Sequence, residues 1–405
     1  MHHRFLDRDA TSLIAARPRP YAWQARSLVA KFFSLLFAAA PLTASTAAAA
    51  EDELLVFVSA FAEGRRGAIH AFRLDPAVGK LEPLARNADI ESPFYMAISR
   101  DDRFLYATHA PGGHGSDATE SVVAFELAGR TGQLKRLNHQ PSGGDVACYV
   151  DVDTTGDTLL VANYGDGSVA ALPIAEDGSL GAARVRIQHQ GSSVHPKRQR
   201  GPHAHSIVIS PDNRFALVGD LGLDQVLVYQ LEPAEARMTA ATEPFARTAA
   251  GAGPRHLTFH PNGRHVYVIN ELDNTITLFD YDPQTATLES QQTIATLPAD
   301  YEGQTYTADV KVTPDGRFLY GTNRGHDSIA CYRIDERGRL ELLDIVPSGG
   351  AGPQNLAVTP GGELLLCANM PGNRVTLFRI DRDSGSLERL DDSVAMPRPS
   401  CILVR

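Results

Sequence analysis

The sequence predicts an all-β fold, a seven-bladed β-propeller with four antiparallel strands per blade, and two observations carry that prediction. A pattern recurs along the chain: an apolar strand, a turn rich in Pro, Asp and Gly, a second apolar strand that ends in Asn or a substitute, and a third strand. Glycine (34 residues) and proline (25 residues) are plentiful while long helical patterns are scarce, which favours short strands joined by turns. Repeats of this length that bury their faces against one another build propellers.

Six copies of the pattern can be marked by the residue that ends the second strand. These residues, spaced 46 to 57 positions apart, are His109, Asn163, Asp220, Asn270, Asn323 and Asn369. A seventh copy begins at Leu54 without its opening strand, and the last residues, RPSCILVR (398–405), have the pattern of that missing strand. We therefore expect the two chain ends to complete one blade between them, which closes the ring and leaves no exposed sheet edge there.

Residues 1–50 have the pattern of a targeting segment, and residues 51–405 that of a single propeller domain. Arg26 and Lys31 precede the apolar run FFSLLFAAAPL (32–42), and small residues follow it as far as Ala50. The apolar run is too short to span a bilayer comfortably, so no stable membrane anchor is expected after processing. The segment predicts a periplasmic or secreted protein, and a cytoplasmic one if it is not a true signal peptide.

The charge balance argues against general nucleic-acid binding. Residues 51–405 carry 32 basic and 46 acidic side chains, a formal net charge of −14. Such a surface repels polyanions, so an anionic substrate would need a local basic cluster. One candidate is HPKRQRGPHAH (195–205), with Lys197, Arg198 and Arg200. The expected partner is a small molecule, and the expected state is a monomer or a weak oligomer.

The cysteines and histidines do not predict a metal site or another cofactor. The four cysteines, which lack the close spacing of zinc or redox motifs, are Cys148, Cys331, Cys367 and Cys401. Each lies in an apolar strand pattern and is expected to be buried as a small hydrophobic side chain, although export would permit disulfides. His203, His205 and His256 could bind a metal, but no acidic partner is fixed by spacing.

The start of the first strand and the end of the second lie at the same end of an antiparallel blade, so residues at these positions should meet around one mouth of the central channel. The residues that the repeat places there are His203, His205, Arg255, His256, Glu271 and Arg324. His203 and His205 are two apart at the start of a strand, so their side chains are expected to point the same way. Two arginines, a glutamate and histidines in one cleft predict a site for a small anionic substrate that undergoes acid-base chemistry.

Other residues near the same mouth are weaker candidates for a functional role. The second-strand asparagines recur in most copies, so they are expected to satisfy turn backbone. Residues that interrupt the repeat are better candidates for catalysis, although exposed arginines and glutamates can also form simple rim ion pairs. The substrate-binding candidates are His256, Lys197, Arg200, Asn270 and Asn323.

Four motifs carry a resemblance to a known family: GSSVHPKRQRGPHAHS (191–206), GPRHLTFHPNG (253–263), INELDNTITLF (269–279) and TNRGHDSIACY (322–332). From about Leu54 to Val404 the chain resembles the lactonase family of seven-bladed propellers, which includes 6-phosphogluconolactonase-like proteins and the carboxy-cis,cis-muconate lactonizing enzyme. The resemblance implies an active site made of the PHxH, GPRH, NE and NRG motifs. These motifs place the site on His203 or His205, Arg255, Glu271 and Arg324.

The sequence departs from the family pattern in two places. THAPGG (108–113) stands where the family usually has an Asn-Glu exit, and Gln354 stands where the family often has arginine. Both departures change the polarity of the rim, so they bear on the identity of the substrate more than on the class of reaction.

The resemblance implies hydrolysis of a sugar-type lactone, which requires a base, an anion stabiliser and an acid. Glu271 or a neutral histidine could activate water, Arg255 and Arg324 could hold the oxyanion or an anionic group, and the other imidazole could protonate the leaving oxygen. No motif for a serine or cysteine nucleophile, such as GxSxG, is evident.

Two alternatives to hydrolysis stay open. One is a non-catalytic propeller that binds a small ligand or a protein on the same face, since this fold serves binding as readily as catalysis. The other is a muconate-type lactonizing cycloisomerase. For a hydrolase, export favours an unphosphorylated aldonolactone, and a cytoplasmic location favours a phosphorylated one.

Overall fold

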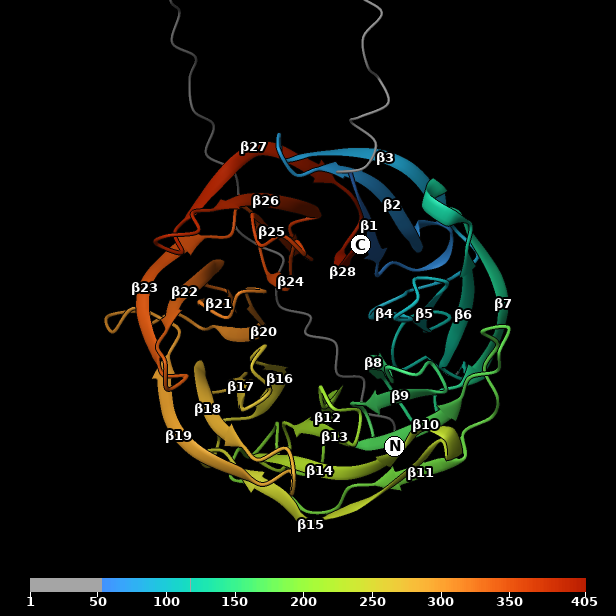
Figure 1. The fold of residues 1–405 in the computed structure, drawn as a ribbon, viewed down its shortest axis with the longest axis horizontal. Coiled ribbons are helices and arrows are strands. Elements are labelled where there is room, and N and C mark those ends of the chain that lie inside the picture. Colours follow the sequence, from blue (N-terminus) through green and yellow to red (C-terminus); the bar gives the residue numbers. More distant parts are fainter. Residues whose placement is uncertain (1–52, 117) are drawn as a thin grey trace, which may run out of the picture. The chain divides into compact units, whose positions relative to one another are not determined.

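The computed structural model describes residues 53–116 and 118–405, so the predicted targeting segment, residues 1–50, lies outside the described residues. Within the described ranges, 28 strands form seven four-stranded antiparallel sheets arranged around a central channel (Figure 1). The predicted seven-bladed propeller is confirmed. The same ranges contain no helix with the length and apolar character needed to cross a bilayer.

We number the blades in chain order and give the strands of each from the channel outward. Blade 1 contains β28 (Pro399–Val404), β1 (Leu54–Ala60), β2 (Ala68–Asp75) and β3 (Lys80–Asn87). Blade 2 contains β4 (Met96–Ile98), β5 (Phe104–His109), β6 (Ser121–Leu127) and β7 (Leu134–Pro141). Blade 3 contains β8 (Ala147–Val152), β9 (Thr158–Asn163), β10 (Ser168–Pro173) and β11 (Val185–Gln188). Blade 4 contains β12 (Ala204–Ile209), β13 (Phe215–Asp220), β14 (Gln225–Glu232) and β15 (Arg237–Arg247).

The remaining blades follow the same order. Blade 5 contains β16 (Pro254–Phe259), β17 (His265–Asn270), β18 (Thr275–Tyr281) and β19 (Leu288–Ala295). Blade 6 contains β20 (Tyr306–Val312), β21 (Phe318–Arg324), β22 (Ser328–Ile334) and β23 (Leu340–Pro347). Blade 7 contains β24 (Pro353–Val358), β25 (Leu364–Asn369), β26 (Arg374–Ile380) and β27 (Leu387–Ala395). Short 3-10 helices in the connections are η1 (Gly64–Arg66), η2 (Gly129–Thr131) and η3 (Pro233–Glu235).

The Pro-Asp-Gly type turns join the first and second strands of their blades, as predicted. In the PDNR turn between β12 and β13, Asn213 has a φ of 62°, and in the PDGR turn between β20 and β21, Gly316 has a φ of 75°. Both values lie in the left-handed region, which asparagine and glycine adopt more readily than other residues. Turn chemistry therefore explains why these residue types recur between the two innermost strands.

The last strand of the chain closes the ring. β28 pairs antiparallel with β1, and its register places Cys401 opposite Ser59 and Val404 opposite Val56. Figure 1 shows this last strand beside the first one, near the C-terminus. The hydroxyls of Ser59 and Ser400 also lie 2.9 Å apart in the buried part of this contact. The prediction that both chain ends complete one blade is confirmed.

Apolar side chains pack between adjacent blades. One cluster, for example, joins Leu217 and Val228 of blade 4 to Val268 and Phe279 of blade 5. All four cysteines are buried with free thiols, which agrees with their prediction as small buried side chains. Apolar packing therefore joins neighbouring blades beside the inner strands.

The innermost strands of blades 4 and 5, β12 and β16, have a β-bulge at the end where the predicted site lies. The ladder shifts register between Ala204 and Ser206 in β12, and between Pro254 and His256 in β16. The extra residue of a bulge is left out of the ladder, and its side chain is re-aimed. In these two strands the extra residues are His205 and Arg255. In these two blades the bulge therefore places an irregular position at the channel mouth.

Candidate active site

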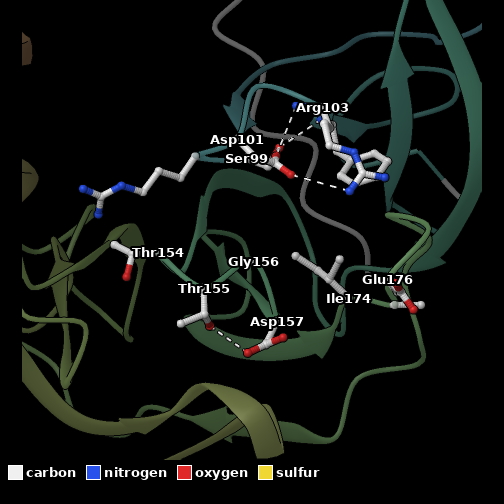
Figure 2. Close-up of a pocket in the computed structure, with 12 residues that line it drawn as sticks. Ser99, Asp101, Arg103, Thr154, Thr155, Gly156, Asp157, Ile174 and Glu176 are labelled. Carbon is white, nitrogen blue, oxygen red and sulfur yellow. Dashed lines mark hydrogen bonds and ion pairs between the residues drawn. The ribbon is translucent and has the colours of Figure 1, made fainter.

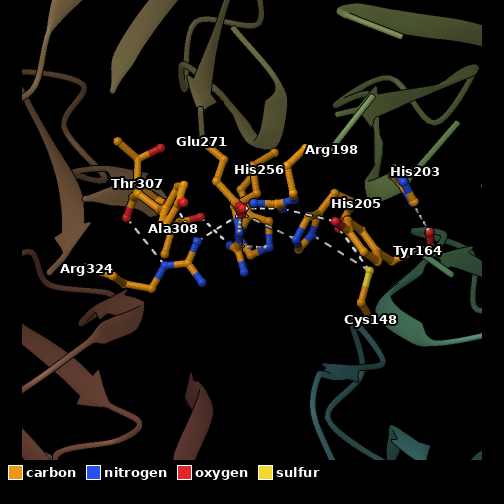
Figure 3. Close-up of polar contacts among 12 residues, drawn as sticks. Cys148, Tyr164, Arg198, His203, His205, His256, Glu271, Thr307, Ala308 and Arg324 are labelled. Atoms are coloured by element: carbon orange, nitrogen blue, oxygen red, sulfur yellow. Dashed lines mark hydrogen bonds and ion pairs between the residues drawn. The ribbon is translucent and has the colours of Figure 1, made fainter. Parts of the chain in front are cut away.

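Glu271 is the centre of a buried charge cluster at the channel mouth (Figure 3). It follows β17 directly and is only 4% exposed. Its Oε2 lies 2.9 Å from Arg255 Nε and 2.9 Å from Arg324 Nη2, and its Oε1 lies 2.6 Å from Arg198 Nη2. Burial alone would raise the pKa of Glu271, but the three guanidiniums hold that pKa well below its usual value. Glu271 is therefore a fixed anion and a weak base.

Arg255 is the most deeply buried of the three arginines, with a side chain 1% exposed. Its Nη1 lies 3.0 Å from His256 Nε2 and also donates to the carbonyl of Ala308. Burial and the neighbouring charge of Arg324 lower the pKa of Arg255 to about 10. The guanidinium stays charged at neutral pH and is held in one orientation by partners from blades 5 and 6.

Arg324 and Arg198 remain partly accessible, with side chains 26% and 31% exposed. Arg324 ends β21, and its Nη2 also donates to the carbonyl of Thr307 at 2.9 Å. Arg198 also donates to the hydroxyl of Tyr164 at 3.0 Å. Three guanidiniums around one carboxylate leave an excess positive charge, and two of them face the mouth. The cluster can therefore attract and hold a small anion or a developing oxyanion.

His205 is the histidine that reaches this cluster. Its Nε2 lies 3.8 Å from Glu271 Oε2, and its Nδ1 lies 3.8 Å from the thiol sulfur of Cys148. Burial, followed by the charge of Arg255, holds the pKa of His205 well below its usual value. The imidazole is therefore neutral at neutral pH and can accept a proton.

His203 and His205, expected to point the same way, both pack against the ring of Tyr164 but differ in their polar contacts. His203 precedes β12, which begins at Ala204, whereas His205 is the extra residue of the bulge. The His203 ring stacks on Tyr164, with ring centroids 4.6 Å apart, and its Nδ1 lies 2.8 Å from the carbonyl oxygen of Tyr164. His203 thus joins blades 3 and 4, while His205 faces Glu271.

The remaining predicted residues lie in different surroundings. Lys197 and Arg200 are exposed, and Arg200 donates to the carbonyl of Pro196. Asn270 and Asn323 are completely buried, and their amides donate to hydroxyls of neighbouring strands in their own blades. His256 is 3% exposed, and its two ring nitrogens contact Arg255 and Asp309. The structure therefore brings His205, Arg255, Glu271 and Arg324 together. The five predicted substrate-binding residues do not contact the Glu271 carboxylate.

Arg198 is the site residue that the sequence reasoning did not select. It lies in the connection between β11 and β12, which is anchored by the buried Gln199. Gln199 Nε2 donates to the carbonyl of Leu221 at 2.8 Å and to Asp224 at 2.7 Å. This anchoring directs Arg198 toward Glu271, while its neighbours in the basic cluster face solvent. The signal available in the sequence was the cluster itself, from which Lys197 and Arg200 were chosen as substrate-binding candidates and Arg198 was not.

A cavity of about 520 Å³ lies between blades 2 and 3, away from this cluster (Figure 2). The turns from Ser99 to Phe104 and from Thr154 to Asp157, together with residues 174–176, line it. The two turns join the first and second strands of their blades, and residues 174–176 follow the third strand, β10, so all three segments belong to the opposite end of the propeller from Glu271. Its polar groups are largely engaged with one another, as in the 2.7 Å hydrogen bond from Thr155 to Asp157. None of the residues predicted for chemistry lines this cavity.

Comparison with known proteins agrees with the geometry. A family model described as lactonase, seven-bladed β-propeller, matches residues 55–404. A 6-phosphogluconolactonase from Bacillus subtilis is 32% identical over 85% of this chain and 97% of its own length. A 6-phosphogluconolactonase from Formosa agariphila is 29% identical over 84% of this chain and 96% of its own. A periplasmic gluconolactonase from Pseudomonas aeruginosa has a solved structure with 32% identity and a TM-score of 0.81, covering 87% of this chain and 99% of that one. The chain belongs to the lactonase family of seven-bladed β-propellers.

Proposed function

We propose that this protein is a lactone hydrolase that opens a sugar-type lactone at the mouth of the propeller channel. One observation carries the proposal: a buried carboxylate bound by three guanidiniums lies beside a neutral imidazole, at Glu271 and His205. Such a site combines a proton acceptor with preorganised positive charge, the two features that ester hydrolysis needs. Family membership and the names of the relatives favour the same chemistry.

In this proposal His205, rather than Glu271, is the base. Three guanidiniums occupy the oxygens of Glu271, whereas the His205 imidazole is neutral, and the carboxylate 3.8 Å from its Nε2 would stabilise the imidazolium that proton transfer forms. His205 takes a proton from water while the water oxygen bonds to the carbonyl carbon of the lactone. Arg324 and Arg198, the accessible guanidiniums, stabilise the oxyanion that forms. The ring carbon–oxygen bond then breaks, and the imidazolium returns its proton to the ring oxygen, which yields the hydroxy acid.

The substrate we propose first is an unphosphorylated aldonolactone. The N-terminal pattern favours export, and the Pseudomonas aeruginosa relative is named a periplasmic gluconolactonase. The Bacillus subtilis relative is named for a phosphorylated lactone, so the phosphorylated compound must be compared directly. The protein would act on this small molecule as a monomer or weak oligomer, in the periplasm or outside the cell, without a nucleic-acid partner, a cofactor or a stable membrane anchor.

A lactone panel tests the proposal. Purified protein is assayed in a pH-stat, which records proton release and proton uptake, with gluconolactone, its 6-phosphate, a muconolactone and the corresponding muconate, at slightly acid pH where spontaneous hydrolysis is slow. The matched control is the Arg255→Ala variant, purified identically, which loses a buried site residue. We expect turnover of gluconolactone above the spontaneous rate and its loss in the variant. Binding without turnover of any lactone would instead indicate a binding propeller, and ring closure of a muconate without hydrolysis would indicate a cycloisomerase.

A further inference from the structure

Asp309 is a buried carboxylate that the proposed reaction does not use directly. It lies in β20 of blade 6 and is completely buried. Its Oδ1 lies 2.8 Å from His256 Nδ1 of blade 5, and its Oδ2 accepts hydrogen bonds from Asn355 Nδ2 at 2.7 Å and from the backbone amide of Leu356 at 2.9 Å, both in blade 7. Lys311 Nζ lies 2.8 Å and 2.9 Å from its two oxygens. Three neighbouring blades therefore meet at one side chain.

The contacts of His256 determine which of its nitrogens carries the proton. A guanidinium can only donate, so Arg255 Nη1, at 3.0 Å, requires His256 Nε2 to be the acceptor. The single proton of the neutral imidazole must then be on Nδ1, where it is donated to Asp309. Burial and the charge of Arg255 lower the pKa of His256 to about 3, which agrees with a neutral ring. An additional proton on Nε2 would point directly at the N–H of Arg255.

We infer that Asp309 is a positioning residue for the lactonase reaction: it fixes the His256 tautomer that holds Arg255 against Glu271. The inference rests on the proposed function and extends it by one residue that touches neither the substrate nor Glu271. The path runs from Asp309 to His256 Nδ1, from His256 Nε2 to Arg255 Nη1, and from Arg255 Nε to Glu271 Oε2 at 2.9 Å. Each link is a hydrogen bond between buried groups, where a lost partner is not replaced by water.

The Asp309→Asn variant interrupts this path with minimal change of shape. Every protein group around the carboxylate is a donor: His256, Lys311, Asn355 and Leu356. A carboxamide has an acceptor oxygen on one side and an NH₂ donor on the other. Its NH₂ group must therefore face donors from which the carboxylate accepted hydrogen bonds. If the amide nitrogen faces His256, the ring can bind it only in the opposite tautomer, whose Nε2–H repels Arg255. The opposite orientation would lose the hydrogen bonds from both Asn355 and Leu356, so we expect the carboxamide oxygen to face blade 7 and the amide nitrogen to face His256.

The kinetic test compares Asp309→Asn with wild type on gluconolactone. We expect kcat to fall about tenfold to a hundredfold, the range for partners that orient a reacting group through another residue, while KM changes by less than about twofold. In an Arg255→Lys background the same substitution should cost less than about twofold, because the path already ends at residue 255. A full additional loss in that background, or an unchanged kcat in the single variant, would overturn the inference.

Asn355→Ala is the matched control for a merely structural effect. It removes another hydrogen bond to the same carboxylate and leaves the amide of Ile402 without its acceptor, but it does not interrupt the path to Arg255. We expect a lower melting temperature and a kcat within about twofold of wild type. If Asn355→Ala lowers kcat as much as Asp309→Asn does, the effect of Asp309 is structural and the inference fails.

A readout that needs no turnover keeps this inference separate from the proposed function. Nitrogen NMR shifts of the labelled imidazole should show His256 protonated at Nδ1 and unprotonated at Nε2 in the wild-type protein. A proton on Nε2 would overturn the inference even if the enzyme is active. If wild type hydrolyses no lactone, the proposed function fails, while the tautomer of His256 still shows whether Asp309 orients Arg255.

Discussion

Replacing Arg255 by lysine removes the planar guanidinium and keeps the positive charge. The Arg255 side chain is 1% exposed and binds Glu271 through Nε, while its Nη1 contacts His256 and the carbonyl of Ala308. Lysine carries a single ammonium on a flexible stem, so it cannot occupy all three positions at once. The substitution therefore separates the geometry of this cation from its charge.

The contacts set the size of the expected effect. Lysine must lose at least one hydrogen bond to a charged group, and such a bond contributes about 1.5–3 kcal/mol. If this energy is expressed in the transition state, kcat/KM falls by ~10-fold to ~160-fold, because each 1.36 kcal/mol corresponds to about a factor of ten. Glu271 keeps two other arginines, so we do not expect the total loss that removal of the carboxylate would cause.

Steady-state kinetics on gluconolactone, corrected for spontaneous hydrolysis, measure this effect, with circular dichroism to confirm folding. The control is His326→Ala, in the loop after β21, where Nδ1 lies 2.7 Å from the hydroxyl of Ser328 and the ring packs against Tyr301. We expect the control to stay within about twofold of wild type. Full activity of Arg255→Lys, or equal damage from His326→Ala, would refute the placement of the chemistry.

Three further predictions concern charge, closure and pH. Glu271→Gln leaves three guanidiniums without their counter-charge, so both kcat and the free energy of unfolding should fall. Denaturant titrations should show a loss of about 3–5 kcal/mol in the free energy of unfolding, and an active variant of wild-type stability would contradict this. Deleting residues 399–405 exposes the edge of β1 and should sharply lower the melting temperature, and an unchanged value would disprove the closure of the ring by β28. His256, with a pKa of about 3 against 6.5 for an ordinary histidine, is protonated between about pH 3 and pH 6.5 only in the unfolded chain. The free energy of unfolding should therefore decrease by about 2 kcal/mol from pH 7 to pH 5, with a smaller decrease in His256→Gln, and a flat profile would refute a buried neutral ring.

Local patterns in the sequence determined the architecture and the neighbourhood of the site. Strand alternation and turn chemistry depend on neighbours in the chain. The copies whose second strands end at Asn270 and Asn323 could therefore be recognised without any structure. The missing strand of the first copy and the apolar run at 398–405 predicted the closed ring, which β28 and β1 form. Because the repeat superimposes equivalent positions, it also placed Arg255 and Glu271 at the same mouth.

Contacts between blades decided which side chains meet there. The bulge after Ala204 directs His205, and not His203, to Glu271, and such a bulge depends on pairing and packing against partners distant in the chain. Arg198 was selected from the basic cluster by the burial of Gln199 beside Asp224, a contact across 25 positions. His256 and Asp309 come from different blades and form a buried pair only when the ring is assembled. Periodicity is a local property of the chain, whereas the direction of a polar side chain is set by the donors and acceptors that the tertiary structure places around it.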